Sequence, residues 1–203
     1  MKVNHLLTAL LLICLSSSAN AQTYIFGSFN VRNDNRGDVG NLWEQRREYA
    51  ANVMRFHQFD VFGTQEGKQN QIDDLSKSLP EYANHGAGRD DGKSAGEHSS
   101  IFYKKDKFKL LSKGDFWLSE TPDKPGLGWD ATCCNRIASW VQLQDVKTGK
   151  KFFFFNAHYD HEGKIARVES SKLMIKKIKE IAGNSPAVFT GDLNGGHESE
   201  WYL

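Results

Sequence analysis

The chain has 203 residues, of which 39% are hydrophobic and 25% are charged, a composition typical of a soluble globular protein with one buried core. Its formal net charge is +1, so it lacks the strong basic field that drives nonspecific binding to nucleic acid, although a local basic cleft remains compatible with it. The aromatic share of 12% favours a sheet-rich interior.

Residues 1–21 have the pattern of a secretory signal peptide. Lys2 supplies a positive start, residues 6–15 form an apolar core, and the sequence Ala-Asn-Ala at the end matches a small-x-small cleavage site. The apolar core is too short to serve as a permanent membrane span. A lipid anchor at Cys14 is a minor alternative, because the bulky residue before it disfavours lipoprotein processing. We therefore expect residues 22–203 to form one exported domain, periplasmic or extracellular.

Beyond this leader, predicted strands and helices alternate along the chain without internal repeats. Strands are expected at 23–31, 59–64, 99–104, 108–118, 136–144, 151–156 and 187–190, and helices at about 41–57, 69–79 and 162–182. The apolar run of the last strand predicts that this strand is buried in a sheet. Helices interleaved with hairpins favour an α/β sandwich over a purely parallel sheet.

The first predicted helix has a plausible capping box in Asn41 and Glu44. Its core face is expected to comprise four apolar side chains: Leu42, Tyr49, Val53 and Phe56. The long third helix presents three apolar residues at core spacing: Met174, Ile178 and Ile181. The stretches 86–96 and 119–134 lack periodicity, and we expect both to be irregular, the first as an exposed loop.

Cys133 and Cys134 are the two cysteines that follow the leader. Neighbouring cysteines bridge only in a strained ring, so we expect two small side chains, buried or half-buried, with a redox role as a lesser alternative. Neither residue has a CxxC or Cys/His partner that would indicate zinc.

Polar residues that suit metal and phosphate chemistry stand at the ends of the predicted strands. They occur in six places along the chain: Asn30, Gln65-Glu66, Glu97, Arg136, 156–160, and Asp192 with Asn194. An Asn and a Glu on neighbouring strand ends can hold a hard cation such as Mg²⁺ through oxygen. A His beside a carboxylate can be held in one tautomer with a raised pKa, and an Arg or an Asn can donate to a phosphate oxygen.

Six short segments carry a resemblance to a known family: SFNVR, TQE, GEHSSIFY, NRIASW, FFNAHYDH and FTGDLN. Their order and spacing resemble the endonuclease/exonuclease/phosphatase family, which includes pancreatic-type deoxyribonucleases, abasic-site endonucleases and bacterial sphingomyelinases. The resemblance runs from about Thr23 to the last residue. It implies a deoxyribonuclease-like α/β fold, in which two packed mixed sheets are flanked by helices to give four layers.

The resemblance implies a metal site and three catalytic residues. By similarity, Asn30 and Glu66 hold the metal, which we expect to be Mg²⁺, with Mn²⁺ or Ca²⁺ as alternatives. Glu97 is expected to orient His158, which would stabilise or protonate the developing charge. Asp192 is expected to orient or deprotonate the attacking water.

The resemblance also implies contacts with a substrate, expected to be a sugar, lipid or nucleic-acid phosphate. Arg136 and Asn194 are expected to contact the phosphate, and Asn156 is placed with them as a substrate-binding residue. The loops at 86–97 and 119–135 are expected to determine which phosphoester is cleaved.

One part of the family pattern is missing from the chain. Members of the family end with a strand that carries an Asp-His pair, and no such pair follows Trp201 here. We therefore expect residues 22–203 to be a domain that is incomplete at its C-terminus and lacks the last strands. The loss of these strands would leave one sheet with an uncovered edge.

The sequence thus predicts an exported, monomeric, Mg²⁺-dependent hydrolase that cleaves a phosphoester, with a phosphodiester as the first expectation, by in-line attack of water. The neutral overall charge makes long nucleic acid a less natural substrate. The alternative is a catalytically inactive remnant that lacks the Asp-His pair and only binds a metal or another ligand.

Overall fold

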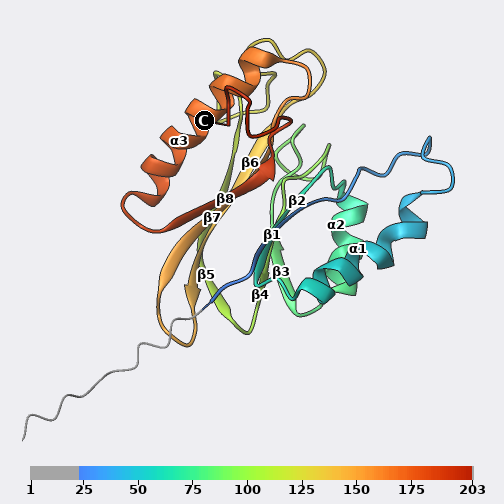
Figure 1. The fold of residues 1–203 in the computed structure, drawn as a ribbon, viewed down its shortest axis with the longest axis vertical. Helices are drawn as coiled ribbons and strands as arrows, with labels where there is room; N and C mark the ends of the chain where they lie inside the picture. The colour runs from blue at the N-terminus through green and yellow to red at the C-terminus, as the bar shows by residue number, and fades with distance from the viewer. Residues whose placement is uncertain (1–22, 203) are drawn as a thin grey trace, which may run out of the picture.

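In the computed structural model, which describes residues 23–202, eight strands form two four-stranded sheets (Figure 1). The first sheet has the spatial order β1-β2-β4-β3, with β1 (Phe26–Asn30), β2 (Val61–Gln65), β4 (Ile101–Lys104) and β3 (Tyr82–His85). The second has the order β5-β6-β7-β8, with β5 (Phe108–Trp117), β6 (Ile137–Asp145), β7 (Lys151–His158) and β8 (Ala187–Asp192). β1 pairs with β2 and β7 with β8 in parallel, and the other pairs are antiparallel, so both sheets are mixed, as expected. The predicted signal peptide lies outside the described residues.

Helices cover the outer faces of the two sheets, which gives the four layers that the resemblance implied (Figure 1). α1 (Trp43–His57) and α2 (Gln69–Ser78) pack on the first sheet, where they share a buried apolar cluster with it. α3 (Lys164–Ala182) packs in the same way on the second sheet. A third apolar cluster fills the space between the two sheets. Within the described part of the chain, none of the helices has the length and apolar character needed to cross a membrane.

Four consecutive phenylalanines in β7 show how the sequence builds these layers. Successive side chains of a strand point to opposite faces of its sheet. Phe152 and Phe154 lie between the two sheets, in one apolar cluster with Val61 of β2. Phe153 and Phe155 point the other way and belong to the cluster beneath α3. β7 is therefore buried on both faces, which explains its continuous apolar run.

Helix α1 differs from its prediction in both its start and its buried face. Leu42 is the N-cap residue, and its backbone N–H donates to Gln45 Oε1 at 2.8 Å, so the predicted capping box of Asn41 and Glu44 is wrong. Tyr49 and Phe56 are 73% and 82% exposed. The residues that face the sheet are instead Trp43, Ala50, Ala51 and Met54. The small alanines let the helix approach the sheet closely, and this packing outweighs the larger apolar side chains on the opposite face.

Two strands were predicted incompletely. β3 was missed, because its four residues carry no alternating apolar pattern, and it pairs with β4 alone at the edge of the first sheet. The expectation that the last strand is buried is wrong, because β8 lies at the edge of the second sheet and its residues are exposed or half-buried. The other predicted strands and the three predicted helices are present, with boundaries shifted by a few residues.

Candidate active site at the ends of four strands

The carboxyl ends of β1, β2, β7 and β8 meet at one end of the sandwich, the upper end in Figure 1. Asn30 ends β1, and its Nδ2 donates to Glu66 Oε1 at 2.8 Å and to Asp192 Oδ2 at 2.9 Å. The parallel pairing within each sheet brings these residues together although Asp192 lies 162 positions beyond Asn30. The two predicted metal ligands and the predicted water-orienting aspartate are thus in contact.

The Glu66 carboxylate is fixed by the segment that follows β1. Its Oε2 accepts hydrogen bonds from the backbone N–H of Asn33 at 3.0 Å and from Asn33 Nδ2 at 3.2 Å. Burial alone would raise the pKa of Glu66, but these bonds and the one from Asn30 outweigh burial and lower it. Glu66 also has a φ of 64°, a left-handed conformation that residues other than glycine adopt mainly at constrained, often functional positions.

Asp192 is held in a similar way. Its Oδ1 accepts a hydrogen bond from the backbone N–H of Asn194 at 3.0 Å, while its Oδ2 accepts the bond from Asn30. Burial raises the pKa of Asp192, but these hydrogen bonds and nearby positive charge lower it further than burial raises it. Glu66 and Asp192 are therefore anionic at neutral pH, which is the charge state that binding of a divalent cation requires.

Helices α1 and α2 hold the segment after β1 in place. Arg46 of α1 donates to the carbonyl oxygens of residues 31–33. Gln71 of α2 is buried, donates to the carbonyl of Arg32 at 2.9 Å and accepts from the backbone N–H of Asp34 at 2.8 Å. The position of the segment that binds Glu66 is thus set by long-range contacts.

His158 ends β7. The expected hydrogen bond between His158 and Glu97 is absent. The distance from His158 Nδ1 to Glu97 Oε2 is 3.9 Å, which is too long for a hydrogen bond. Glu97 instead accepts from Arg89 Nη1 at 2.7 Å and from Asn33 Nδ2 at 3.2 Å. The guanidinium offers a charge-assisted bond that a neutral imidazole cannot match. Burial, as the largest cause, raises the pKa of Glu97.

The pKa of His158 is also opposite to the expectation. Burial, the largest cause, and the positive charge of Arg136 lower it to about 4, although Asp192 and Glu66 act in the other direction. The expected raised pKa assumed a direct carboxylate partner, which the structure does not provide. His158 is therefore neutral at pH 7.

This pKa predicts how acid destabilises the metal-free protein. The unfolded chain binds a proton at a histidine below about pH 6.5, whereas folded His158 stays neutral down to about pH 4, so stability falls as pH decreases through this interval. Between pH 7 and pH 5, the wild type in EDTA is expected to lose about 2 kcal/mol more unfolding free energy than His158→Gln. Urea unfolding at the two pH values measures this difference. Equal losses in the two proteins would contradict the neutral His158, and His197→Gln, at an exposed site, is the control.

Arg136 is buried and held by the segment between β7 and α3. Its Nε donates to Asp160 Oδ2 at 3.3 Å, and its Nη2 lies 2.7 Å from His161 Nδ1. Asp160 Oδ1 in turn accepts from the backbone N–H groups of Glu162 and Gly163. The guanidinium is therefore oriented before any substrate binds, and its Nη1 is buried without an acceptor among residues 23–202.

The two asparagines that were predicted to bind substrate, Asn156 and Asn194, play different parts. Asn194 lines the cavity described below, and its Nδ2 donates to the carbonyl of Tyr159 at 2.8 Å. Asn156 does not reach the cavity, because it is completely buried between the sheets. Its Nδ2 donates to the carbonyls of Thr64 and Ser100, and its Oδ1 accepts from Gln65 Nε2 at 2.7 Å. The structure therefore does not support the expected substrate contact of Asn156 and makes this residue a link between the sheets.

A cavity of about 370 Å³ lies over these groups. Five of the predicted site residues line it: Glu66, Glu97, Arg136, His158 and Asn194. Asn30 and Asp192 line a second cavity of about 390 Å³. Arg89 and Asn33 also line the first cavity but were missed, because neither stands at a strand end. The available signal was that both are polar residues in loops that adjoin predicted site residues, Asn33 after Asn30 and Arg89 before Glu97.

Cys133 and Cys134 are joined by a disulfide, so the expectation of two separate thiols is wrong. Cys133 is exposed, contrary to expectation, and Cys134 is half-buried in the cavity wall. Cys133, Asp160 and His161 place one possible ligand atom each within 4.8 Å of one another. This group does not fit a metal, because the sulfur is not a thiolate and Asp160 already binds Arg136 and the start of α3.

Comparison with known proteins gives high similarity to two solved structures. An endonuclease/exonuclease/phosphatase family protein from Bacteroides thetaiotaomicron is 50% identical, with a TM-score of 0.84 over 86% of this chain and 65% of that one. The mannosyl-6-phosphatase of Bacteroides thetaiotaomicron VPI-5482 is 48% identical, with a TM-score of 0.86 over 89% of this chain and 68% of that one.

Sequence comparison alone gives weaker matches. An uncharacterized protein of Acanthamoeba polyphaga mimivirus is 27% identical over 160 residues, which cover 75% of this chain and 59% of the viral protein. No family model matches the chain. The chain thus spans between 59% and 68% of the length of these three proteins.

Proposed function

Because the chain belongs to the endonuclease/exonuclease/phosphatase family, we propose that it hydrolyses a phosphoester bond with the help of a divalent cation. One observation carries the proposal: Asn30, Glu66 and Asp192 meet within hydrogen-bonding distance at the strand ends. His158 and Arg136 line the cavity that Glu66 shares, so groups suited to metal, water and phosphate lie together.

The donor set fits a hard cation. Glu66 would hold it through a carboxylate oxygen, with Asp192 beside it and water in the remaining positions. Asn30 would contribute its Oδ1, which in this structure accepts a hydrogen bond from the backbone N–H of Arg32 at 2.9 Å while Nδ2 faces the two carboxylates. Two anionic carboxylates and an amide favour Mg²⁺, with Mn²⁺ or Ca²⁺ as alternatives. When bound, the cation would stabilise negative charge on the phosphoryl oxygens.

The residues of this chain would divide the remaining tasks. Asp192, anionic and fixed by Asn194 and Asn30, is suited to orient a water molecule and accept its proton. Neutral His158 is suited to donate a hydrogen bond to a phosphoryl oxygen as negative charge develops there. Arg136 would bind another phosphoryl oxygen and hold the group in line with the water.

The substrate is proposed to be a sugar phosphate monoester. Support comes from the mannosyl-6-phosphatase, which is 48% identical to this chain. A cavity of about 370 Å³ is large enough for a phosphoryl group and part of a sugar. This proposal replaces the earlier first expectation of a phosphodiester, which remains the alternative. Export of the protein is also proposed, on the strength of its first 21 residues.

Metal removal tests the proposed reaction. With Mg²⁺, the protein is expected to release phosphate from mannose 6-phosphate faster than it cleaves bis(p-nitrophenyl) phosphate. EDTA is expected to reduce both rates to background, because the phosphoryl charge then loses its main stabilising partner. Excess Mg²⁺ added after EDTA is the control and should restore the rate. Turnover that persists unchanged in EDTA would contradict the proposal, and faster cleavage of the diester would reject the monoester.

A further inference from the structure

The backbone of Arg89 is held firmly within the loop 86–97, which connects β3 to β4. The N–H of Arg89 donates to the carbonyl of Glu97 at 3.0 Å, and its carbonyl accepts from Trp117 Nε1 at 2.7 Å. A Cβ added to Gly88 would lie 2.3 Å from a carbonyl oxygen on the opposite limb of the loop, so the limbs are in contact. Arg89 is therefore attached to a rigid support, although the tip of the loop is exposed.

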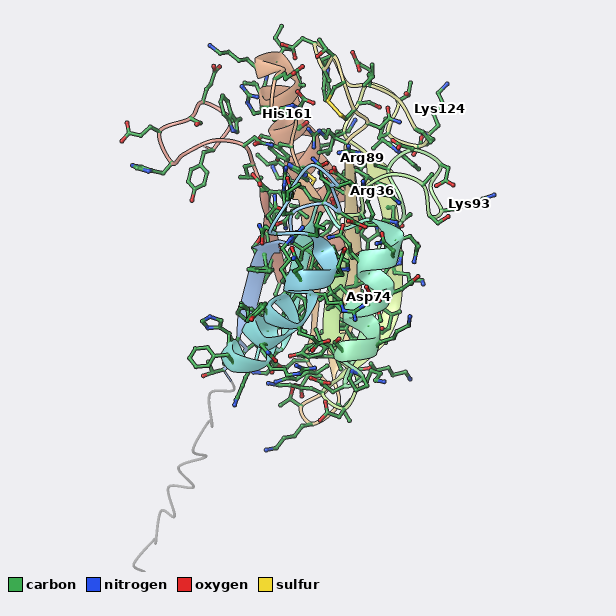
Figure 2. All side chains as sticks on the ribbon, turned by 90° about the vertical axis from the view of Figure 1, so that its right-hand side faces the viewer. Arg36, Asp74, Arg89, Lys93, Lys124 and His161 are labelled. Carbon is green, nitrogen blue, oxygen red and sulfur yellow. A yellow bond between two sulfur atoms is a disulfide. The ribbon has the colours of Figure 1, made fainter. Side chains whose placement is uncertain are left out.

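The Arg89 side chain turns inward from this support. It lines the 370 Å³ cavity, its side chain is only 14% exposed, and its Nη1 lies 2.7 Å from Glu97 Oε2. Lys93, on the same loop, is exposed, and in Figure 2 it extends away from the molecule, whereas Arg89 lies within the outline. The loop thus carries one inward cation and one outward cation, which form a natural pair for comparison.

The Arg89 guanidinium uses only some of its donors to bind Glu97. Among residues 23–202, Nη1 alone of its three nitrogens has an acceptor, and Nε is buried without one. Arg136 Nη1, in the same cavity wall, is also buried without an acceptor. After burial, the positive charge of Arg89 is the next cause that lowers the pKa of Arg136, so the two guanidiniums are close enough to repel each other. An anion in the cavity would relieve this repulsion.

We propose that Arg89 is a substrate-binding residue that, together with Arg136, binds the phosphoryl oxygens of a phosphate monoester. This inference rests on the proposed function. Arg89 pairs with Glu97 and Arg136 with Asp160, yet among residues 23–202 each guanidinium keeps a buried nitrogen without an acceptor. These unused donors suit the three terminal oxygens of a phosphate monoester better than the two of a diester, and a planar guanidinium holds its donors in a fixed geometry.

The test compares Arg89→Lys with the wild type and uses Lys93→Gln as the matched control. Lysine keeps a cation opposite Glu97 but lacks the planar fork of arginine. Two quantities are measured in Mg²⁺: kcat and KM for mannose 6-phosphate, and the Kd for inorganic phosphate by calorimetry. Arg89→Lys is expected to raise both KM and Kd by about 10- to 100-fold, with kcat close to the wild-type value. Lys93→Gln is expected to change neither constant.

The two readouts separate this inference from the proposed function. Absence of turnover in the wild type would contradict the proposed function, while phosphate binding still tests Arg89. If KM and Kd of Arg89→Lys equal those of the wild type, the inference is overturned, because Arg89 would then only balance the charge of Glu97. The inference is also overturned if the wild-type protein binds no phosphate. If Arg89→Lys fails to fold, the double variant Arg89→Gln/Glu97→Gln, which removes both charges together, takes its place and is expected to show the same rise in Kd.

Discussion

His158→Ala is expected to lower kcat by about 100- to 1,000-fold, the usual effect of removing one donor that stabilises charge in a transition state. His158 lines the cavity with Arg136 and is neutral at pH 7, so it can donate a hydrogen bond to a phosphoryl oxygen. Its Nδ1 has no hydrogen-bond partner among the described residues, so its removal breaks no hydrogen bond at that atom and the fold should persist.

Steady-state hydrolysis with Mg²⁺ measures this effect, and circular dichroism checks the fold. His197→Ala is the control, because His197 is 81% exposed, and it should retain full activity. A kcat for His158→Ala within a few fold of the wild type would remove His158 from the mechanism.

Gly63→Ala is expected to destabilise the protein by about 3 kcal/mol, the upper part of the usual range for overpacking a core. Gly63 lies in β2, facing the second sheet, and a Cβ there would come within 2.2 Å of Asn156 Oδ1 and 2.8 Å of Thr190 Oγ1. These atoms belong to the hydrogen-bond network that links the sheets, so they cannot move aside without losing partners.

Urea denaturation of the two proteins measures this loss. Gly126→Ala is the matched control, because its added Cβ would lie 3.6 Å from the nearest atom, at ordinary contact distance, and the change should stay within about 0.5 kcal/mol. Equal stability of Gly63→Ala and the wild type would show that the sheets are not held in register by the Asn156 network.

Most of the elements, and the meeting of Asn30, Glu66 and Asp192, were predictable because they follow from local patterns. Alternating patterns and apolar runs predict the strands, and a polar residue that ends a strand must lie at that end of the sheet. Asn30, Glu66 and Asp192 satisfy this rule, and the parallel pairs β1-β2 and β7-β8 bring them together. The order of the six motifs supplied the fold, which the solved structures confirm.

Other features depend on how deeply a side chain is buried and on which residues from distant parts of the chain lie beside it. A sequence pattern contains neither kind of information. Asn156 follows the strand-end pattern, yet it points between the sheets, because Gly63 on β2 leaves space for its amide. The low pKa of His158 results from burial and from Arg136. Glu97 pairs with Arg89 instead of His158 because a folded loop places the guanidinium nearer.

The central claim is that Glu66 is a ligand of a divalent cation at the ends of these strands, and Mg²⁺ binding by calorimetry tests it most directly. The wild type is predicted to bind one Mg²⁺ per chain at this site. Glu66→Gln is predicted to bind Mg²⁺ at least about 100-fold more weakly. Removal of a residue that only hydrogen-bonds to a metal ligand already weakens binding by up to about 100-fold, and loss of the ligand itself should weaken it more. Glu198→Gln, at a site that is 87% exposed, should bind like the wild type. Equal Mg²⁺ affinity in Glu66→Gln and the wild type would contradict the account.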